Sequence, residues 1–229
     1  MIFRVTTAVS QAWDAEYARG RYLDEAPVPF VDDILTACQE TGLAGARCLY
    51  IGCGNGRNLQ ALAQAGLDVV GLDVSATAIS QLAERVPGHR DRLVVGDLTS
   101  LPSDATYPVV VGIQVFQHGN RAVAHEHIRQ AQRRVAAGGL FALRVNAVGT
   151  DVYPAHEIIE QWNDEGFTVR YVEGSKAGLD VHFFAKTELK RLFVSDFEPR
   201  LGLRIASTHR DPASLGQWSQ WEAIFQKKR

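Results

Sequence analysis

A short apolar run that breaks abruptly into glycines constrains the fold of this chain more than any other stretch. Residues 49–51 predict a buried strand, and Gly52, Gly54 and Gly56 predict the tight turn that follows it. Because glycine has no Cβ, the backbone N–H groups of such a turn can approach a bound ligand closely. The helix expected to begin near Arg57 directs its positive N-terminal end at the same place. The stretch therefore predicts a seat for a nucleotide-like or polar ligand above the end of a strand.

Strands and helices alternate along most of the chain. Further apolar runs predict strands at 69–72, 93–95, 109–115, 140–145, 201–208 and 218–225, and amphipathic patterns predict helices at 30–38, 59–63, 75–86, 121–137 and 186–193. Short links between them imply parallel strands joined by right-handed crossovers. The last two strands, with Asp211-Pro212 between them, predict a closing hairpin. We therefore expect an α/β fold in which helices cover both faces of a doubly wound sheet.

The N-terminal segment, residues 1–26, does not belong to this alternation. It contains Trp13, Tyr17 and Tyr22 at spacings that suit a short helix with aromatic side chains on one side. Two interpretations fit equally well: an arm that packs these rings on the domain, or a lid that closes over a ligand.

A second irregular segment covers residues 147–185. It contains several glycines, a helical pattern around 156–165 and a polar loop at 174–178. A segment of this length between a strand and the next helix is usually functional or mobile. We expect residues 1–229 to form a single domain in which this insertion shapes a ligand pocket.

The composition limits the class of protein. The chain has 229 residues, 46% of them hydrophobic, which suffices for one domain with a single core. Its 24 Lys and Arg against 26 Asp and Glu give a formal charge of −2, which argues against a nucleic-acid partner. Cys38, Cys48 and Cys53 are too few for a disulfide framework and suit a reducing compartment. Without a leader pattern or a bilayer-length apolar run, we expect a soluble cytoplasmic monomer or homodimer that binds no membrane.

Two acidic residues at strand ends narrow the choice of ligand. Asp73 ends the second strand, about 20 residues after the first glycine, where a carboxylate accepts hydrogen bonds from both hydroxyls of a ribose. Asp97 ends the third strand and is followed by Leu98, a pair suited to bind an adenine amino group and cover the ring. An NAD-dependent oxidoreductase also fits Asp73. It is disfavoured by Asp97 and by the G-x-G-x-G spacing, since the dinucleotide fingerprint is G-x-G-x-x-G.

In their order along the chain, these motifs resemble those of class I S-adenosylmethionine-dependent methyltransferases. The resemblance covers about residues 27–146, and its motifs are Leu49 to Gly56, Val70 to Val74, Val95 to Leu98, and Val109 to Phe116 with Gly138-Gly139. It implies a Rossmann-like sheet of seven strands whose last strand is antiparallel. It also implies S-adenosylmethionine as the cofactor and S-adenosylhomocysteine as the product.

The resemblance further implies a cofactor site made of strand ends and the glycine turn. It expects the methionine part near the backbone of Gly52, Cys53 and Gly54 and near Gln114, the ribose on Asp73, and the adenine between Val74 and Leu98 with its amino group on Asp97. Gly56-Arg57-Asn58 and the arm with Trp13 and Tyr17 resemble the small-molecule branch that includes tellurite and thiopurine methyltransferases. This likeness adds Trp13, Tyr17 and Asn58 to the expected cofactor site. Cys53 itself is interpreted as a small residue in a tight turn rather than a nucleophile.

His118 is the candidate catalytic base. Methyl transfer from a sulfonium needs alignment and desolvation, and a base only when the acceptor must lose a proton. His118 follows the fourth strand at the mouth of the site, and Tyr17 or Tyr22 of the arm is its candidate partner. The alternative interpretation is a loop histidine that bonds backbone and positions the arm.

The residues expected to bind the acceptor are Tyr22 of the arm and, from the later strand ends and the insertion, Phe116, Arg144, His182 and Phe183. Arg144 ends the fifth strand, where a guanidinium receives a carboxylate or phosphate of the acceptor or pairs with a carboxylate of the lid. His182 precedes two phenylalanines and either edges the acceptor pocket or packs beneath the loop.

Motifs of other methyltransferase classes are not evident. Residues 114–117 lack the signature with which amino-methylating DNA enzymes grip a flipped base, and no acidic set of the magnesium-dependent catechol type is found. His125 and His127 are two apart on a helix and cannot face one metal ion, so we expect no metal site. These features favour a small-molecule acceptor, methylated at oxygen of an aromatic or heteroaromatic compound. The alternatives are methylation at nitrogen or sulfur, or a catalytically silent nucleotide-binding scaffold.

Overall fold

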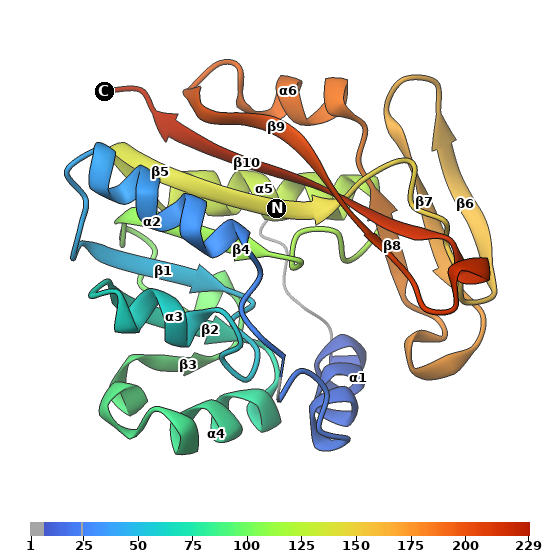
Figure 1. Ribbon diagram of the computed structural model, residues 1–229, viewed down its shortest axis with the longest axis horizontal. Coiled ribbons are helices and arrows are strands. Elements are labelled where there is room, and N and C mark those ends of the chain that lie inside the picture. The colour runs from blue at the N-terminus through green and yellow to red at the C-terminus, as the bar shows by residue number, and fades with distance from the viewer. Residues whose placement is uncertain (1–6, 24) are drawn as a thin grey trace.

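A seven-stranded sheet forms the centre of the protein, shown as a computed structural model in Figure 1. The structure describes residues 7–23 and 25–229. The strands lie in the order β3 (Leu93–Val95), β2 (Asp68–Asp73), β1 (Arg47–Ile51), β4 (Tyr107–Ile113), β5 (Val135–Asn146), β10 (Gln217–Lys227) and β9 (Phe197–His209). β1 pairs in parallel with β2 and β4, whereas β10 runs antiparallel to both β5 and β9. The predicted Rossmann-like α/β sheet with an antiparallel last strand is therefore confirmed.

Helices cover both faces of this sheet and bury a separate core on each. The covering helices are α2 (Phe30–Glu40), α3 (Leu59–Gln64) and α4 (Ala76–Arg85) on one face, and α5 (Arg121–Arg133) and α6 (Lys186–Phe193) on the other. Cys48 and Tyr50 of β1 point to the first core, and Leu49 and Ile51 to the second, because successive strand side chains alternate between faces. Among the described helices, none is both long and apolar enough to span a bilayer.

The N-terminal helix α1 (Thr7–Ala18) is docked on the start of α4. Asp14 Oδ1 accepts hydrogen bonds from Ser75 Oγ at 2.6 Å and from the Thr77 backbone N–H at 3.0 Å. A carboxylate at this place is also stabilised by the positive end of the α4 dipole. The predicted arm thus contains a helix, while its residues 1–6 and Asp24 lie outside the described part of the chain.

The insertion after β5 is a three-stranded antiparallel sheet, which corrects the helix predicted around 156–165. Its strands are β6 (His156–Trp162), β7 (Gly166–Tyr171) and β8 (Asp180–Phe183), with the 3-10 turn η3 (Gly174–Lys176) between the last two. Asp164 and Gly166 have φ values of 65° and 85°, so the chain reverses there and β7 pairs back on β6. Strand pairing outweighs the local helical pattern.

The fifth strand starts earlier than predicted, and α5 ends earlier, at Arg133 instead of Ala137. Val135 already pairs with Tyr107 of β4, and the register then shifts before the next pair. Gly138, with a φ of 74°, lies in this irregularity inside β5. The glycine pair therefore forms a bulge in a strand and does not end the helix.

The chain closes with the predicted hairpin of β9 and β10, which are joined through the 3-10 turn η4 (Ala213–Leu215). Two further 3-10 turns, η1 (Pro87–Arg92) and η2 (Leu98–Ser100), flank β3. Figure 1 shows this hairpin, the three-stranded sheet and α1 around the same end of the central strands. The site described next lies there.

Candidate cofactor and acceptor site

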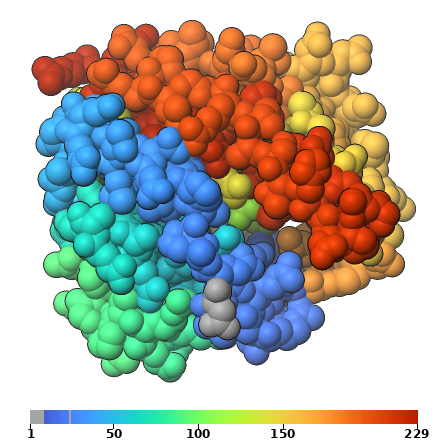
Figure 2. Space-filling model, viewed as in Figure 1, coloured from blue at the N-terminus to red at the C-terminus, as the bar shows by residue number. Residues whose placement is uncertain are grey.

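A cavity of about 290 Å³ lies at the carboxyl ends of β1, β2 and β4. Figure 2 shows the surface hollowed between the N-terminal segment and the hairpin of β9 and β10. Most residues predicted for the site line this cavity, namely Trp13, Tyr17, Tyr22, Gly52, Cys53, Gly54, Asn58, Asp73, Val74, Asp97, Leu98, Gln114, Phe116, His118 and Phe183. Arg144 and His182 are not among the lining residues.

The glycine turn after β1 has no room for side chains. Gly52 has a φ of 68°, and a Cβ there would lie 2.6 Å from the side chain of Val115. Gly54 has a φ of 54°, and its Cβ would lie 2.5 Å from the hydroxyl oxygen of Tyr17. Only glycine combines a readily adopted positive φ with the absence of a Cβ. The bare backbone of residues 52–54 therefore forms part of the cavity wall.

Asp73 ends β2 with a carboxylate that the backbone holds in place. Its Oδ2 accepts the Gly54 N–H at 2.8 Å, and its Oδ1 accepts the Ser75 N–H at 2.9 Å. Burial raises the pKa of Asp73, and these hydrogen bonds act against that rise. Each carboxylate oxygen retains a further lone pair, so the group can still accept hydrogen bonds from hydroxyls of a ligand in the cavity.

The end of β3 supplies a second acid beside aliphatic side chains. Asp97 Oδ1 accepts hydrogen bonds from the backbone N–H and the hydroxyl of Thr99, at 2.8 and 2.6 Å, and so caps η2. Val74 and Leu98 line the cavity beside it. An acceptor group flanked by aliphatic side chains suits a flat ring with an amino substituent.

The chain leaves β4 through a strained turn. Gln114 has a φ of 60°, which is costly for a residue other than glycine, and such strain clusters at functional sites. Its carbonyl oxygen accepts a hydrogen bond from Gln117 Nε2 at 2.8 Å. Gln117 Oε1 is buried without a hydrogen-bond partner in the described residues, and Gln117 lines the cavity. An orphaned acceptor at a cavity wall favours a ligand that donates a hydrogen bond there.

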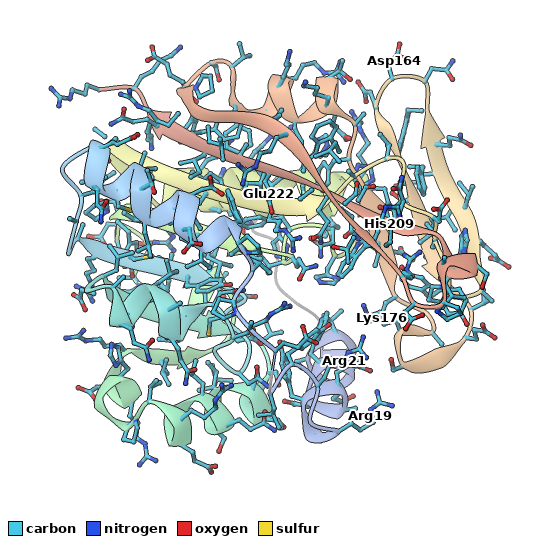
Figure 3. All side chains as sticks on the ribbon, viewed as in Figure 1. Arg19, Arg21, Asp164, Lys176, His209 and Glu222 are labelled. Atoms are coloured by element: carbon cyan, nitrogen blue, oxygen red, sulfur yellow. The ribbon has the colours of Figure 1, made fainter. Side chains whose placement is uncertain are left out.

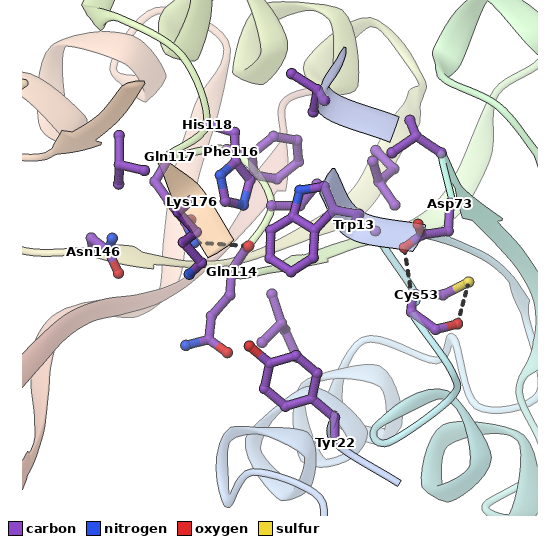
Figure 4. Close-up of a pocket in the computed structure, with 18 of the residues that line it drawn as sticks. Trp13, Tyr22, Cys53, Asp73, Gln114, Phe116, Gln117, His118, Asn146 and Lys176 are labelled. Carbon is purple, nitrogen blue, oxygen red and sulfur yellow. Dashed lines mark hydrogen bonds between the residues drawn. The ribbon is translucent and has the colours of Figure 1, made fainter. Parts of the chain in front are cut away.

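His118 lies beside the aromatic side chains of α1. Its ring contacts that of Trp13 edge-on, with 5.1 Å between the ring centroids (Figure 4). Burial lowers the pKa of His118 to about 3, and the Lys176 ammonium contributes to the drop. The imidazole is therefore neutral at physiological pH and a weak base. These observations favour the interpretation of His118 as a residue that positions the arm.

Tyr17 and Tyr22 complete the aromatic cover. Their ring centroids are 6.1 Å apart, and Trp13 lies at the same distance from Tyr17. Burial raises the pKa of Tyr17 far above its ordinary value, and the Asp73 carboxylate adds to the rise. Tyr17 therefore keeps its proton and acts as a hydrogen-bond donor rather than as a base.

Residues 48–139, which include the glycine turn and both strand-end acids, match a family model described as a methyltransferase domain. These residues form a methyltransferase domain. A methyltransferase domain is an enzyme domain that uses S-adenosylmethionine. No curated protein matches the sequence.

Solved structures support the fold of this methyltransferase over nearly its whole length. The 1,6-didemethyltoxoflavin N1-methyltransferase of Burkholderia thailandensis superposes with a TM-score of 0.69 at 16% identity, covering 97% of this chain and 88% of that one. TehB from Haemophilus influenzae has a TM-score of 0.63 at 20% identity, with 94% and 67% covered. The amino pentose methyltransferase CalS10 of Micromonospora echinaspora has a TM-score of 0.60 at 17% identity, with 93% and 97% covered.

The cavity of the methyltransferase fits its cofactor in three respects. The turn at Gly52 and Gly54 presents bare backbone, Asp73 offers carboxylate lone pairs at the strand end, and Gln117 leaves a buried acceptor unused. The cofactor carries an amino group and ribose hydroxyls, which are donors for such acceptors. The donor and acceptor chemistry of the wall therefore matches that of S-adenosylmethionine.

Arg144 does not reach the cavity of the methyltransferase, which corrects its assignment to the acceptor. It lies opposite Glu222 in the pairing of β5 with β10, and its Nε donates to Glu222 Oε1 at 2.9 Å. Arg204 of β9 contacts the same carboxylate. Arg144 is 8% exposed and takes part in a cross-strand ion pair within the sheet.

His182 also points away from the acceptor, and the reason is strand alternation. Phe183, its neighbour in β8, lines the cavity, so His182 faces the other side of the strand. There it is fully buried, with Nδ1 2.9 Å from the Thr168 hydroxyl and Nε2 3.1 Å from Glu188 Oε1. These contacts fit the second interpretation of His182, in which the side chain packs beneath the loop.

Glu188 of α6 is the centre of a buried cluster with His125 and His182. His125 Nε2 lies 2.6 Å from Glu188 Oε1, and Arg121 Nε donates to the same oxygen at 3.2 Å. The two histidines and the carboxylate place their ligand atoms within 4.8 Å of one another. Each of these groups already has a hydrogen-bond partner, and the guanidinium of Arg121 adds a positive charge. The hydrogen bonds of the cluster therefore join α5, α6 and the three-stranded sheet.

Asn58 and Cys53, which were also predicted for the site, line the cavity, but neither provides a reactive group. Asn58 Oδ1 accepts from the Val28 N–H at 2.9 Å, and its Nδ2 donates to Tyr50 Oη at the same distance. Its amide therefore joins neighbouring segments. Burial raises the pKa of Cys53 well above its ordinary value, so it is a thiol and not a nucleophilic thiolate.

Several lining residues of the cavity were not predicted from the sequence pattern. They are Gln117 after β4, Lys176 in η3, Tyr171 of β7, Arg210 after β9 and Trp218 of β10. Among these, only Lys176 had a usable indication, since it is the one charged residue of the polar loop 174–178. Gln117 follows β4, and the others reach the site through pairing of distant strands.

Proposed function

We propose that this methyltransferase transfers the methyl group of S-adenosylmethionine to a small aromatic or heteroaromatic acceptor. The observation that carries the proposal is a single cavity with two unlike parts. Near β2 and β3 it contains the carboxylates of Asp73 and Asp97, and near β8 and β10 it is lined by the rings of Phe183 and Trp218. Flat aromatic walls suit a flat acceptor.

The proposed cofactor site is the part between the glycine turn and η2. Asp73 accepts hydrogen bonds from the ribose, Asp97 binds the adenine amino group, and Val74 and Leu98 enclose the ring. Bound S-adenosylmethionine supplies an electrophilic methyl group whose leaving group is a neutral thioether. The chain itself aligns the two reactants and keeps water away, which is the main catalytic requirement of such a displacement.

We assign the segment of α1 and the turn after it the role of a lid. Trp13, Tyr17 and Tyr22 belong to this segment and all line the cavity. Asp14 anchors the segment to α4 through two hydrogen bonds. The insertion from 147 to 185 supplies the opposite wall through Phe183 and Tyr171.

Oxygen is the acceptor atom favoured by the sequence, and nitrogen is a second candidate favoured by one observation. The pKa of His118 is lowered to about 3 by burial, so this histidine is a weak base for an acceptor hydroxyl. A neutral ring nitrogen attacks through its lone pair and needs no base. The Burkholderia thailandensis enzyme with the same fold is named as an N1-methyltransferase.

The cofactor part of the proposal is tested by calorimetric titration of S-adenosylhomocysteine into wild type, Asp73→Asn and Asp91→Asn. Asp91 is exposed in η1 and serves as the matched control. We expect Asp73→Asn to bind at least about 10-fold more weakly, a loss of roughly 1.4 kcal/mol, and Asp91→Asn to equal wild type. Absence of binding to wild type, or equal affinity in all three proteins, contradicts the proposed site.

The acceptor part is tested by a screen of phenols, heteroaromatic amines and thiols, with S-adenosylhomocysteine release as the readout. Products of active compounds are then identified by NMR, which distinguishes methylated oxygen from methylated nitrogen. Turnover confined to aliphatic compounds would contradict the aromatic acceptor.

A further inference from the structure

The charged residues of the cavity are separated by sign. Among the described residues that line it, the only carboxylates are Asp73 and Asp97, at the ends of β2 and β3. Lys176 and Arg210 line the cavity from η3 and from the end of β9, toward the opposite edge of the sheet. Arg57 also lines it, but its guanidinium is paired with Glu25 at 2.7 Å. The acceptor part of the cavity is therefore positively charged.

Lys176 extends from η3 toward α1 (Figure 3), and its ammonium lies 5.5 Å from the centroid of the Trp13 ring. In the described part of the chain, no carboxylate lies within 4.0 Å of this ammonium. The nearby Glu16 is already bound by Arg19 and lies 3.8 Å from Arg21. Burial lowers the pKa of Lys176, and Arg21 adds to this while Glu16 opposes it. The cation is thus partly desolvated and weakly compensated.

Arg210 is a second cation without a carboxylate partner in the described residues. Its Nη1 donates to the backbone carbonyl oxygens of Asp151 and Leu215, each at 2.6 Å. These bonds fix the guanidinium without neutralising it. Arg210 and Tyr171 both line the cavity.

Two cations in a partly buried site carry a desolvation cost that an anionic ligand relieves. We propose that Lys176 and Arg210 bind a negatively charged group of the acceptor, so that the substrate is an anionic aromatic compound carrying a carboxylate or an ionised ring oxygen. This inference rests on the proposed function. In Figure 4 Lys176 lies with His118 and Asn146 on one side of Trp13, whereas Asp73 and Cys53 lie on the other.

An anionic acceptor also agrees with the weak base at His118. An acceptor oxygen that binds already ionised has no proton to lose. Its lone pair forms the bond to the methyl carbon, and the electrons of the broken carbon–sulfur bond remain on sulfur as a neutral thioether. The competing explanation for Lys176 is structural: its ammonium stacks on Trp13 and holds α1 closed.

The test uses pairs of probes that differ in charge and little else, salicylate with salicylamide and nicotinate with nicotinamide. Binding to the full chain saturated with S-adenosylhomocysteine is measured by calorimetry at pH 7.5. We expect the anionic member to bind at least about 10-fold more tightly than its neutral partner. Lys176→Met and Arg210→Met should each remove most of this preference, whereas Lys176→Arg and the exposed control Lys190→Met should retain it.

Each outcome has a defined meaning. Equal binding of both members, or no binding of any anionic probe to the loaded wild type, overturns the proposal. A preference that survives in both methionine variants also overturns it. If Lys176→Met weakens binding of the neutral probes and of S-adenosylhomocysteine by the same factor, Lys176 acts only as a structural contact of α1. Failure of wild type to bind S-adenosylhomocysteine would instead reject the proposed function itself.

Discussion

The Gly54 backbone N–H donates a 2.8 Å hydrogen bond to Asp73 Oδ2, and this bond joins the turn after β1 to the end of β2. Asp73 and Gly54, which the sequence pattern predicts for the cofactor site, are thus joined directly by a hydrogen bond. The carboxylate orders the turn, and the turn holds the carboxylate at the cavity wall. Changes at either residue should affect cofactor binding.

Gly54→Ala should abolish most cofactor binding. The new Cβ would lie 2.5 Å from Tyr17 Oη, and φ is 54°, so the variant has both a steric clash and backbone strain. We expect at least about a 10-fold loss in S-adenosylhomocysteine affinity, with stability lower by about 1–3 kcal/mol. Gly42→Ala is the matched control, because its φ of 72° carries the strain while nothing lies within 4 Å of the new Cβ. A similar loss of affinity in both variants would rule out the clash as the cause.

Asp14→Ala should loosen α1 without disturbing the sheet. The carboxylate accepts hydrogen bonds from Ser75 and Thr77 at the start of α4, a contact worth about 1 kcal/mol. Hydrogen exchange of α1 amides should rise and cofactor affinity should fall several-fold, while Gln11→Ala on the exposed side of α1 leaves both unchanged. Unaltered exchange in Asp14→Ala would mean that other contacts hold the helix.

Acid should destabilise the enzyme through His118. Unfolded imidazole is protonated below about pH 6.5, whereas burial lowers the pKa of folded His118 to about 3. The stabilising contribution of the neutral ring is therefore complete above pH 6.5 and is lost as the pH falls toward 3. The slope is about 1.4 kcal/mol per pH unit. Chemical denaturation at pH 7.5 and 5.5 should show a smaller decrease for His118→Gln than for wild type or for the exposed control His209→Gln.

His118→Gln should also distinguish the two roles of this residue. As a positioning residue it acts through the Trp13 ring, so the variant should raise KM and weaken cofactor binding more than it lowers kcat. A catalytic base would produce the reverse, a large fall in kcat with unchanged cofactor affinity. Steady-state kinetics with any acceptor found in the screen, together with titration of S-adenosylhomocysteine, measures both quantities.

Glu188→Gln should destabilise the fold while leaving the cavity intact. Burial raises the pKa of Glu188, but hydrogen bonds from His125 and His182 outweigh this and bring it down to about 2. This contribution is present above pH 4.5 and is lost as the pH falls toward 2. Removing the charge at neutral pH should cost on the order of 3 kcal/mol. Denaturation should detect the loss, with Glu198→Gln as an exposed control, and S-adenosylhomocysteine affinity should stay at the wild-type value.

Local sequence signals were enough for the central sheet but not for its irregularities. The strands from β1 to β5 follow from short apolar runs between turn residues, because each signal lies within its own segment. Gly138 was misinterpreted as the end of a helix because its role depends on the pairing of Val135 with Tyr107, which local periodicity does not report. The strand β6 was predicted as a helix for the same reason.

In the site, too, residues could be predicted where their signal is local in the sequence, but not where their role depends on contacts between distant segments. Asp73 and Asp97 were predictable because each directly follows a strand, and the ends of neighbouring parallel strands meet at one edge of the sheet. Arg144 was assigned to the acceptor because its partner, Glu222, is far away in the sequence and becomes its neighbour only through the antiparallel pairing of β10. Lys176 was missed because its contact with Trp13 joins the insertion to the N-terminal helix.

The single helix α1 covers both parts of the cavity. At one end Tyr17 lies against Gly54, and at the other Trp13 lies between His118 and Lys176. A displacement of this helix would therefore open both parts of the cavity at once. Loosening the contact of Asp14 with the start of α4 should then speed the exchange of cofactor and acceptor together.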